Sequence, residues 1–132
     1  MIILPKLNFG NLNTIKSFLD QIGITHNTIE VKEIINLHEG KVLIPGNGNW
    51  KSYIDSGLVE LIKKNKNLKF IGICGGLQIF FDSSEENPGK GASILEGKVI
   101  KLSSITPTID YLPVSNYGHM YFSNSYGIPF KK

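Results

Sequence analysis

Apolar residues in the first 81 positions change repeatedly between short continuous runs and spacings of three and four. The continuous runs predict strands, because a strand that is covered on both faces reads as unbroken apolar sequence. Such runs fall at residues 2–4 and 70–73, and the segments at residues 28–31 and 41–44, which each include a charged residue, also predict short strands. We expect residues 70–73, which read Phe-Ile-Gly-Ile, to be buried on both sides of a sheet.

Helical spacing predicts three helices and one short helical turn around these runs. The first helix follows Asn11 or Asn13, either of which is a suitable N-cap, and stops at a glycine. Residues 34–37 predict a single turn, residues 54–66 a helix that closes with lysines, and residues 76–81 a last helix. The expected buried face of the first helix consists of Leu12, Ile15, Phe18, Leu19 and Ile22.

Strands that alternate with helices predict an α/β fold with a mainly parallel sheet and helices on both faces. Residues 94–102 alternate and predict an exposed sheet or hairpin, whereas residues 103–132 are rich in Ser, Pro, Asn, Tyr and Gly and show no clear period. A chain of 132 residues without an internal repeat corresponds to one domain.

Composition excludes several classes of protein. With 41% hydrophobic and 19% charged residues the chain has enough apolar material for a core. The net charge of +3 is spread along the sequence, so we expect no nucleic-acid partner. No apolar stretch is long enough to span a membrane, and Pro5 and Lys6 interrupt the start too early for a signal peptide, so we expect a cytoplasmic protein without a membrane partner.

Cys74 is the only cysteine, and only three histidines accompany it. An internal disulfide and a closed Cys/His zinc site are therefore excluded, and we expect no metal and no cofactor. By itself a lone cysteine is best interpreted as a small core residue.

The surroundings of Cys74 favour a different interpretation. It lies in Gly-Ile-Cys-Gly-Gly, between an apolar strand and a predicted helix, which is the nucleophile-elbow pattern with Cys in place of Ser. Gly72 and Gly76 remove side chains that would collide at such a sharp turn. The start of a helix also favours a thiolate and supplies N–H groups for an oxyanion. We therefore expect a nucleophilic thiol above the sheet.

A second glycine loop, Pro-Gly-Asn-Gly at residues 45–48, follows the strand at residues 41–44. The carboxyl ends of parallel strands lie at one edge of a sheet, so both loops are expected there. Taken alone the segment is an ordinary turn. A phosphate-binding flavodoxin-like domain is a further alternative, although the loop lacks the lysine of a P-loop.

Four segments of the chain together resemble one enzyme family: FGNLNTIKSFL, VLIPGNGNW, FIGICGGLQIFFDSSEE and LEGKVIKL. They are similar to class I, triad-type glutamine amidotransferases, and most similar to the glutamine amidotransferase subunit of imidazole glycerol phosphate synthase. The resemblance covers residues 1 to 102. It implies a flavodoxin-like three-layer sandwich, and a cysteine that converts the side-chain amide of glutamine into a thioester and free ammonia for a synthase partner.

The resemblance also implies roles for individual residues. Cys74 matches the nucleophile, and the backbone N–H groups of Gly75, Asn47 and Gly48 match the oxyanion hole. The positions that hold the glutamine substrate match Gly46, Gly48, Gln78 and Glu86, with Glu86 suited to the ammonium group. Without the resemblance, Gln78 is best interpreted as a helix surface residue, and Glu86 with its neighbour Glu85 as a solvated acidic pair.

The chain departs from the family downstream of the elbow. The family base is a histidine followed two positions later by glutamate, and this pair is absent, since His119 is the only later histidine and no glutamate follows Glu96. His119 serves as a base only if residues 117–122 fold back over the elbow. The segment HMYFSNSYGIPFKK resembles, in compressed form, family sequence around PHMGWN and YFVHSY. Gly75 stands where many relatives carry a larger residue.

We expect residues 1–132 to form a single, incomplete glutamine amidotransferase domain that lacks the C-terminal part of the family fold. Truncation is the first explanation; a fragment completed by another polypeptide and a domain that has lost its glutaminase chemistry are the alternatives. The predicted function is a glutaminase subunit, a hydrolase that supplies a lyase-type cyclase partner in a heterodimer of histidine biosynthesis. The alternative is an inactive scaffold or binding protein that lacks the His and Glu of the triad.

Overall fold

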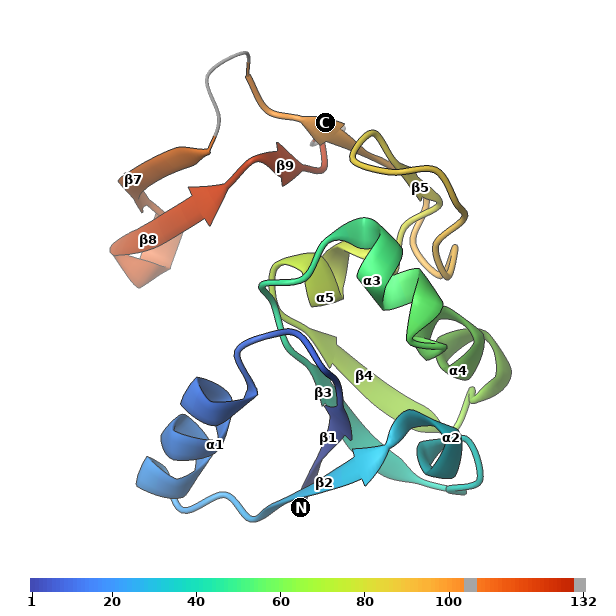
Figure 1. Ribbon diagram of the computed structural model, residues 1–132. Coiled ribbons are helices and arrows are strands. Elements are labelled where there is room, and N and C mark those ends of the chain that lie inside the picture. Colours follow the sequence, from blue (N-terminus) through green and yellow to red (C-terminus); the bar gives the residue numbers. More distant parts are fainter. Residues whose placement is uncertain (104–106, 130–132) are drawn as a thin grey trace.

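The computed structural model describes residues 1–103 and 107–129. Its centre is a four-stranded, entirely parallel sheet with the strand order β2-β1-β3-β4 (Figure 1). This order places β1 and β3 in the middle of the sheet and β2 and β4 at its edges. The strands are β1 (Ile2–Lys6), β2 (His26–Glu30), β3 (Gly40–Ile44) and β4 (Leu68–Gly72).

Helices cover both faces of this sheet. The helices are α1 (Leu12–Gln21), α2 (Val31–Ile34), α3 (Trp50–Asp55), α4 (Leu58–Lys64) and α5 (Gly75–Gln78). Helix α1 lies on one face; of the other four helices, α2, α3 and α4 lie on the opposite face, and α5 lies at the carboxyl end of β4 (Figure 1). Alternate residues of β1 serve the two layers, since Ile3 belongs to the larger core cluster whereas Ile2 and Leu4 pack with α1. The predicted α/β three-layer fold is confirmed.

Two of the predicted helices are shorter than the apolar spacing indicated. The helix expected over residues 54–66 is divided into α3 and α4, because Gly57 between them adopts a left-handed conformation with φ of +81°. Asn49 starts α3 by accepting a hydrogen bond from the Ser52 amide at 2.8 Å. The helix expected over residues 76–81 is a single turn that ends at Gln78, with turn-like bonding beyond it.

On the α1 side of the sheet, the edge strand β4 is more exposed than the sequence predicted. Ile71 and Ile73 are both 44% exposed, so the expectation that this strand is buried on both faces is wrong. Phe18 of α1 and its C-cap residue Ile22 are also exposed, although Leu19 is buried as expected. One helix about 10 Å wide spans about two strands spaced 4.8 Å apart, so α1 alone does not reach the edge strand.

The second half of the chain adds a small sheet and a hairpin. The strand predicted within residues 94–102 is present, but it forms no hairpin there, since it pairs in parallel with β5 and antiparallel with β9. Residues 108–124, within the segment that showed no clear period, form the antiparallel hairpin of β7 and β8. The elements are β5 (Ser83–Ser84), β6 (Lys98–Lys101), β7 (Thr108–Pro113), η1 (Ser115–Tyr117), β8 (His119–Asn124) and β9 (Tyr126–Gly127).

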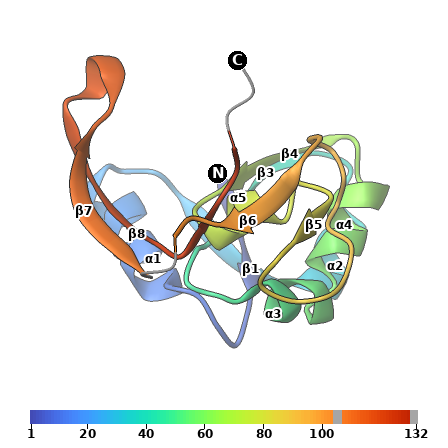
Figure 2. The same ribbon diagram turned by 90° about the horizontal axis from the view of Figure 1, so that it is seen from above.

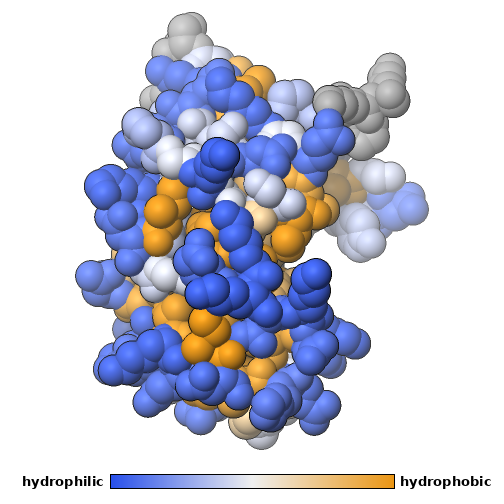
Figure 3. Space-filling model, turned by 90° about the vertical axis from the view of Figure 1, so that its right-hand side faces the viewer, coloured by the Kyte–Doolittle hydropathy of each residue, from blue (hydrophilic) through white to orange (hydrophobic). Residues whose placement is uncertain are grey.

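The β7–β8 hairpin projects from the body, as Figures 1 and 2 both show. It carries exposed apolar side chains, among them Tyr111 and Tyr121, which face each other across the two strands with ring centroids 5.3 Å apart. By contrast, the face of the molecule that bears α2, α4 and β5 is mainly polar with small apolar patches (Figure 3). None of the helices in the described ranges is long and apolar enough to cross a membrane.

Candidate active site

The predicted elbow is present at the carboxyl end of β4. The strand ends at Gly72, Cys74 turns the chain, and α5 starts at Gly75. Cys74 has φ of 50° and ψ of −115°, a backbone conformation that costs a non-glycine residue about 1–3 kcal/mol. Its side chain is exposed. The strained bend therefore holds a free thiol at the surface, above the sheet.

The glycines on either side of Cys74 have the steric role that the sequence predicted. A Cβ atom on Gly72 would lie 2.5 Å from the backbone of Leu77, so the strand could not turn so sharply into α5. A Cβ atom on Gly76 would lie 2.5 Å from the carbonyl oxygen of Ile44 and 2.8 Å from that of Pro45. Close approach of α5 to the end of β3 thus requires glycine at position 76.

The loop after β3 lies directly beside the elbow. The Ile73 amide donates to the Ile44 carbonyl oxygen at 3.0 Å, and a Cβ atom on Gly46 would lie 2.9 Å from the Cβ atom of Cys74. Asn47 turns this loop with φ of 65°, a conformation that asparagine tolerates better than most residues. Two glycine loops from different strands therefore meet at Cys74, as parallel topology predicted.

These loops form one wall of a pocket of about 310 Å³. Of the predicted site residues, Gly46 alone does not line it, because it is buried behind Cys74. The volume suits a ligand of amino-acid size. The lining residues are Asn47, Gly48, Asn49, Cys74, Gly75, Gln78, Glu86, Ser123, Asn124, Ser125 and Tyr126.

Gln78 and Glu86 are both half-buried and fixed by hydrogen bonds. The Gln78 side-chain amide donates from Nε2 to the Tyr126 carbonyl oxygen at 3.0 Å. Glu86 accepts from the Trp50 amide at 2.7 Å, which satisfies an unpaired N–H in the first turn of α3. Neither residue is therefore a freely solvated surface group. Glu85 next to it is exposed and instead bonds Lys98 and the Lys101 amide.

Sequence reasoning missed the wall that the end of β8 supplies. Asn124 is 50 positions away from Cys74 in sequence, yet its Oδ1 lies 3.5 Å from the Cys74 sulfur and accepts the thiol hydrogen. Ser123, Ser125 and Tyr126 line the pocket beside it. The one available signal was the likeness of YFSNSY to YFVHSY, to which no site role was assigned.

The alternative base, His119, does not reach the thiol. It lies at the opposite end of β8, paired in register with Pro113, and is exposed. Five residues of extended chain separate it from Asn124, which corresponds to about 17 Å. The segment of residues 117–122 therefore does not fold over the elbow.

The described lining of the pocket contains neither histidine nor lysine, so the phosphate-binding alternative finds no cation in that lining.

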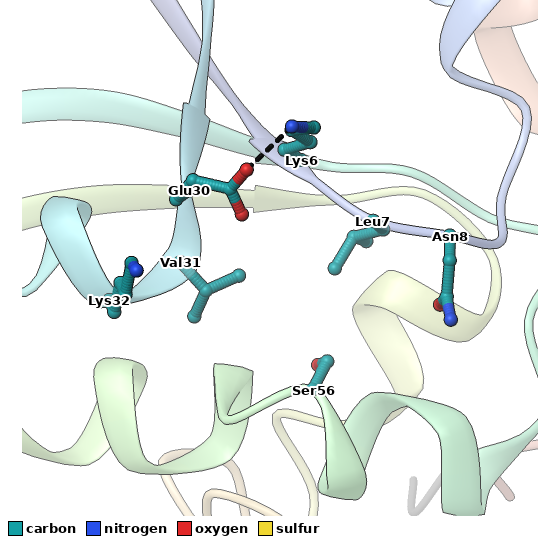
Figure 4. A pocket seen from close by; sticks show the side chains of 7 residues that line it. All are labelled: Lys6, Leu7, Asn8, Glu30, Val31, Lys32 and Ser56. Atoms are coloured by element: carbon teal, nitrogen blue, oxygen red, sulfur yellow. Dashed lines mark ion pairs between the residues drawn. The ribbon is translucent and has the colours of Figure 1, made fainter.

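A separate hollow opens at the carboxyl ends of β1 and β2 (Figure 4). Lys6 and Glu30 form an ion pair of 2.6 Å at its rim, while Asn8 and Ser56 supply polar groups. Both members of the pair are exposed, and each neutralises the other. The described lining of this hollow contains neither cysteine nor histidine. Among residues 1–103 and 107–129 no His, Cys, Asp and Glu side chains gather in a group able to hold a metal ion.

Comparison with known proteins gives several matches over most of the chain. A Pyrococcus furiosus protein called imidazole glycerol phosphate synthase subunit HisH is 33% identical, with 95% of this chain and 71% of that protein covered. Proteins with the same description from Methanocaldococcus jannaschii and Geobacillus kaustophilus are 37% and 30% identical. The match covers 80% of this chain and 55% of the former, and 89% of this chain and 59% of the latter. No protein-family model matches.

Proposed function

Because the chain belongs to the family of HisH subunits of imidazole glycerol phosphate synthase, we propose that it is a glutamine amidotransferase subunit. In this proposal it hydrolyses the side-chain amide of glutamine at Cys74 and passes the ammonia to a cyclase partner in a heterodimer. Residues 1–132 act as one glutamine amidotransferase domain. No cofactor and no metal take part.

One observation supports this proposal above all others, namely an exposed thiol on a strained bend where two glycine loops converge. A strained backbone conformation persists only where the surrounding structure enforces it, and such positions cluster at reactive sites. Here Gly72 and Gly76 permit the bend, while the neighbouring loop lies against the Cys74 backbone. A cysteine with a purely structural role would be buried, and it would not require this conformation.

The proposed reaction has two halves. The Cys74 sulfur attacks the side-chain carbonyl carbon of glutamine, and the carbonyl oxygen becomes an oxyanion beside the N–H groups of Gly75, Asn47 and Gly48. Collapse of this intermediate breaks the C–N bond and releases ammonia once the nitrogen has gained the proton that the thiol gave up. Water then hydrolyses the thioester to glutamate and the free thiol. Each oxyanion donor of this kind contributes about 10²–10³ in rate.

Glutamine binding is assigned to the remaining pocket residues. The Glu86 carboxylate, held by the Trp50 amide, would attract the ammonium group of the substrate. Gln78 would form the adjoining wall, fixed by its bond to Tyr126. Gly46 and Gly48 would act through their lack of a side chain, which lets the loop lie against Cys74 at position 46 and against the Phe9 ring at position 48. Ser123 and Asn124 complete the enclosure from β8.

A second candidate function is glutamine binding without turnover. The observation that favours it is the absence of histidine from the described lining of the pocket, together with Asn124 as the hydrogen-bond partner of the sulfur. An amide accepts a hydrogen bond but does not carry a proton to the leaving nitrogen. A missing general acid and base typically lowers a rate by about 10²–10⁴.

The test separates reaction at the thiol from release of ammonia. The chain is mixed with glutamine, with and without a cyclase subunit from a HisH relative, and ammonia is measured. In parallel, a chloroketone analogue of glutamine is used to alkylate Cys74, a reaction that needs no proton on a leaving amine. The control is Cys74→Ala, which lacks the sulfur.

Glutamine-dependent ammonia release that Cys74→Ala abolishes supports the proposed enzyme. Rapid, glutamine-protected alkylation without ammonia release supports the binding function instead. Alkylation by the analogue no faster than that of free cysteine would overturn both, because the pocket would then neither recognise glutamine nor activate the thiol.

A further inference from the structure

Tyr53 lies directly beneath the two glycine loops, and no role has yet been given to it. It belongs to α3 and is fully buried. Its hydroxyl donates to the Pro45 carbonyl oxygen at 2.7 Å. Its ring meets Phe9 edge-on, with ring centroids 4.9 Å apart. Both ends of this side chain are therefore fixed.

The same side chain also contacts the far end of the Pro-Gly-Asn-Gly loop. A Cβ atom on Gly48, the last residue of the loop, would lie 3.0 Å from Cε2 of the Tyr53 ring. Tyr53 thus donates to Pro45, the first residue of the loop, and its ring lies against the last. One side chain therefore holds both ends of the loop.

The ring of Tyr53 also sets the distance between the two loops. A Cβ atom on Gly75 would lie 2.7 Å from Cε2 and 2.9 Å from the hydroxyl oxygen of Tyr53. A Cβ atom on Gly48 would lie 2.5 Å from the Phe9 ring and 3.0 Å from the same Cε2 atom of Tyr53. Tyr53 therefore occupies the space that a side chain at position 75 would need, and together with Phe9 the space that one at position 48 would need.

We propose that Tyr53 is a positioning residue for the oxyanion hole, holding the Pro-Gly-Asn-Gly loop and Gly75 in one fixed geometry beside Cys74. This inference rests on the proposed function. Stabilisation of an oxyanion depends on donors that need no rearrangement during the reaction, so a residue that fixes both loops acts on the rate without touching the substrate. Tyr53 is not part of the pocket lining.

The test compares two reagents for the same sulfur. The glutamine chloroketone presents a carbonyl oxygen to the oxyanion hole, whereas iodoacetamide needs only an accessible thiolate. Tyr53→Phe keeps the ring and removes the hydroxyl. We expect the ratio of the two alkylation rates to fall about 10-fold in Tyr53→Phe, less than the effect of deleting a donor itself. Tyr111→Phe on the exposed hairpin is the matched control, for which the ratio stays unchanged.

A second measurement needs no ligand. Hydrogen exchange at the Gly48 amide is expected to become faster in Tyr53→Phe, because the loop loses the hydrogen bond that holds Pro45, and to stay unchanged in Tyr111→Phe. An unchanged ratio overturns the proposal, and so does a raised ratio, which would mean that the hydroxyl keeps the loop out of its reactive geometry. Unchanged exchange at Gly48 overturns it as well.

If Tyr53→Phe fails to fold, Gly75→Ala replaces it, since its methyl group presses on the ring while the hydroxyl remains. The rate ratio should fall in this variant too, and an unchanged ratio in folded Gly75→Ala overturns the proposal. Failure of the proposed function has a different signature: the unsubstituted chain then shows no preference for the chloroketone. The Gly48 exchange measurement still tests the hold of Tyr53 on the loop in that case.

Discussion

At the scale of single residues, the site depends on conformations that ordinary side chains resist. Cys74 occupies a backbone region that favours glycine, and Gly72 and Gly76 are required by contacts of 2.5 Å that any Cβ atom would make. The thiol therefore stands at a position that is unfavourable for its own residue type. The backbone conformation that exposes the sulfur therefore lowers the stability of the fold at this residue.

Substitutions at position 74 measure how much stability this conformation costs. We expect Cys74→Gly to have a free energy of unfolding about 1 kcal/mol higher than Cys74→Ala, because glycine adopts φ of 50° and ψ of −115° without strain. Urea unfolding of the two variants gives the difference. Gly118→Ala is the control in the opposite direction, since it places a side chain at φ of +75° with no atom within 4 Å, and we expect it to destabilise.

Equal stability of Cys74→Gly and Cys74→Ala would show that the bend is relaxed in the folded protein. The turn at Cys74 would then be an unstrained one, even if the thiol reacts. Both variants lack the sulfur, so the comparison is independent of thiol chemistry.

At the scale of elements, the sequence predicted what is local and missed what depends on distant contacts. The four strands and the elbow follow from short apolar runs and glycine spacing, and the structure confirms them. The burial of Phe18 and Ile73 was overestimated, because burial depends on how many helices cover a face. Asn124 was missed because the path of β8 brings it to Cys74 from 50 positions away. Nothing local marked Tyr53, whose role depends on two loops packing on its ring.

The connection between β5 and β6 depends on two carboxylates. Asp82 accepts from the Gly97 amide at 2.9 Å, which lowers the pKa of Asp82 below 3.8. Glu85 accepts hydrogen bonds from the Lys101 amide, which has the larger effect, and from the Lys98 side chain. Both lower the pKa of Glu85 below its ordinary value of 4.5. Groups with lowered pKa values stabilise the folded state above their ordinary pKa, and this contribution is lost as the pH falls through the lowered values.

We therefore expect this connection to loosen below about pH 4. Protection factors from hydrogen exchange at the Gly97 and Lys101 amides, compared between pH 5 and pH 3, provide the measurement. Asp82→Asn and Glu85→Gln should remove the pH dependence at Gly97 and Lys101 respectively. Asp20→Asn on α1 is the control and should leave both unchanged. Identical pH dependence in all variants would assign the effect to the fold as a whole.

At the scale of the whole molecule, the two faces of the main sheet are unequally covered. Helices α2, α3 and α4 pack on one face, whereas α1 alone covers part of the other (Figure 1) and leaves Ile71 and Ile73 exposed. The β7–β8 hairpin adds a further set of exposed apolar side chains away from the body. Exposed apolar area of this extent favours association with other surfaces.

Threonine substitutions test the difference between the exposed and the buried apolar side chains of the two faces. The double variant Ile71→Thr/Ile73→Thr is expected to bind less of an apolar fluorescent dye while losing about 1 kcal/mol of stability, because both side chains are already half in water. Ile79→Thr, in the buried core, should lose about 3 kcal/mol. Dye fluorescence and urea unfolding provide the two readings. Undiminished dye binding in the double variant would assign the dye site to the hairpin.

Because of the strained bend, the residue found at position 74 reports on the evolutionary history of the protein. A single base change converts a cysteine codon into one for glycine, and that mutation would relax the backbone of the protein. A lineage in which nothing acts through the sulfur would thus gain from losing it. Persistence of the thiol among descendants would record continued use, and its replacement by glycine would record disuse.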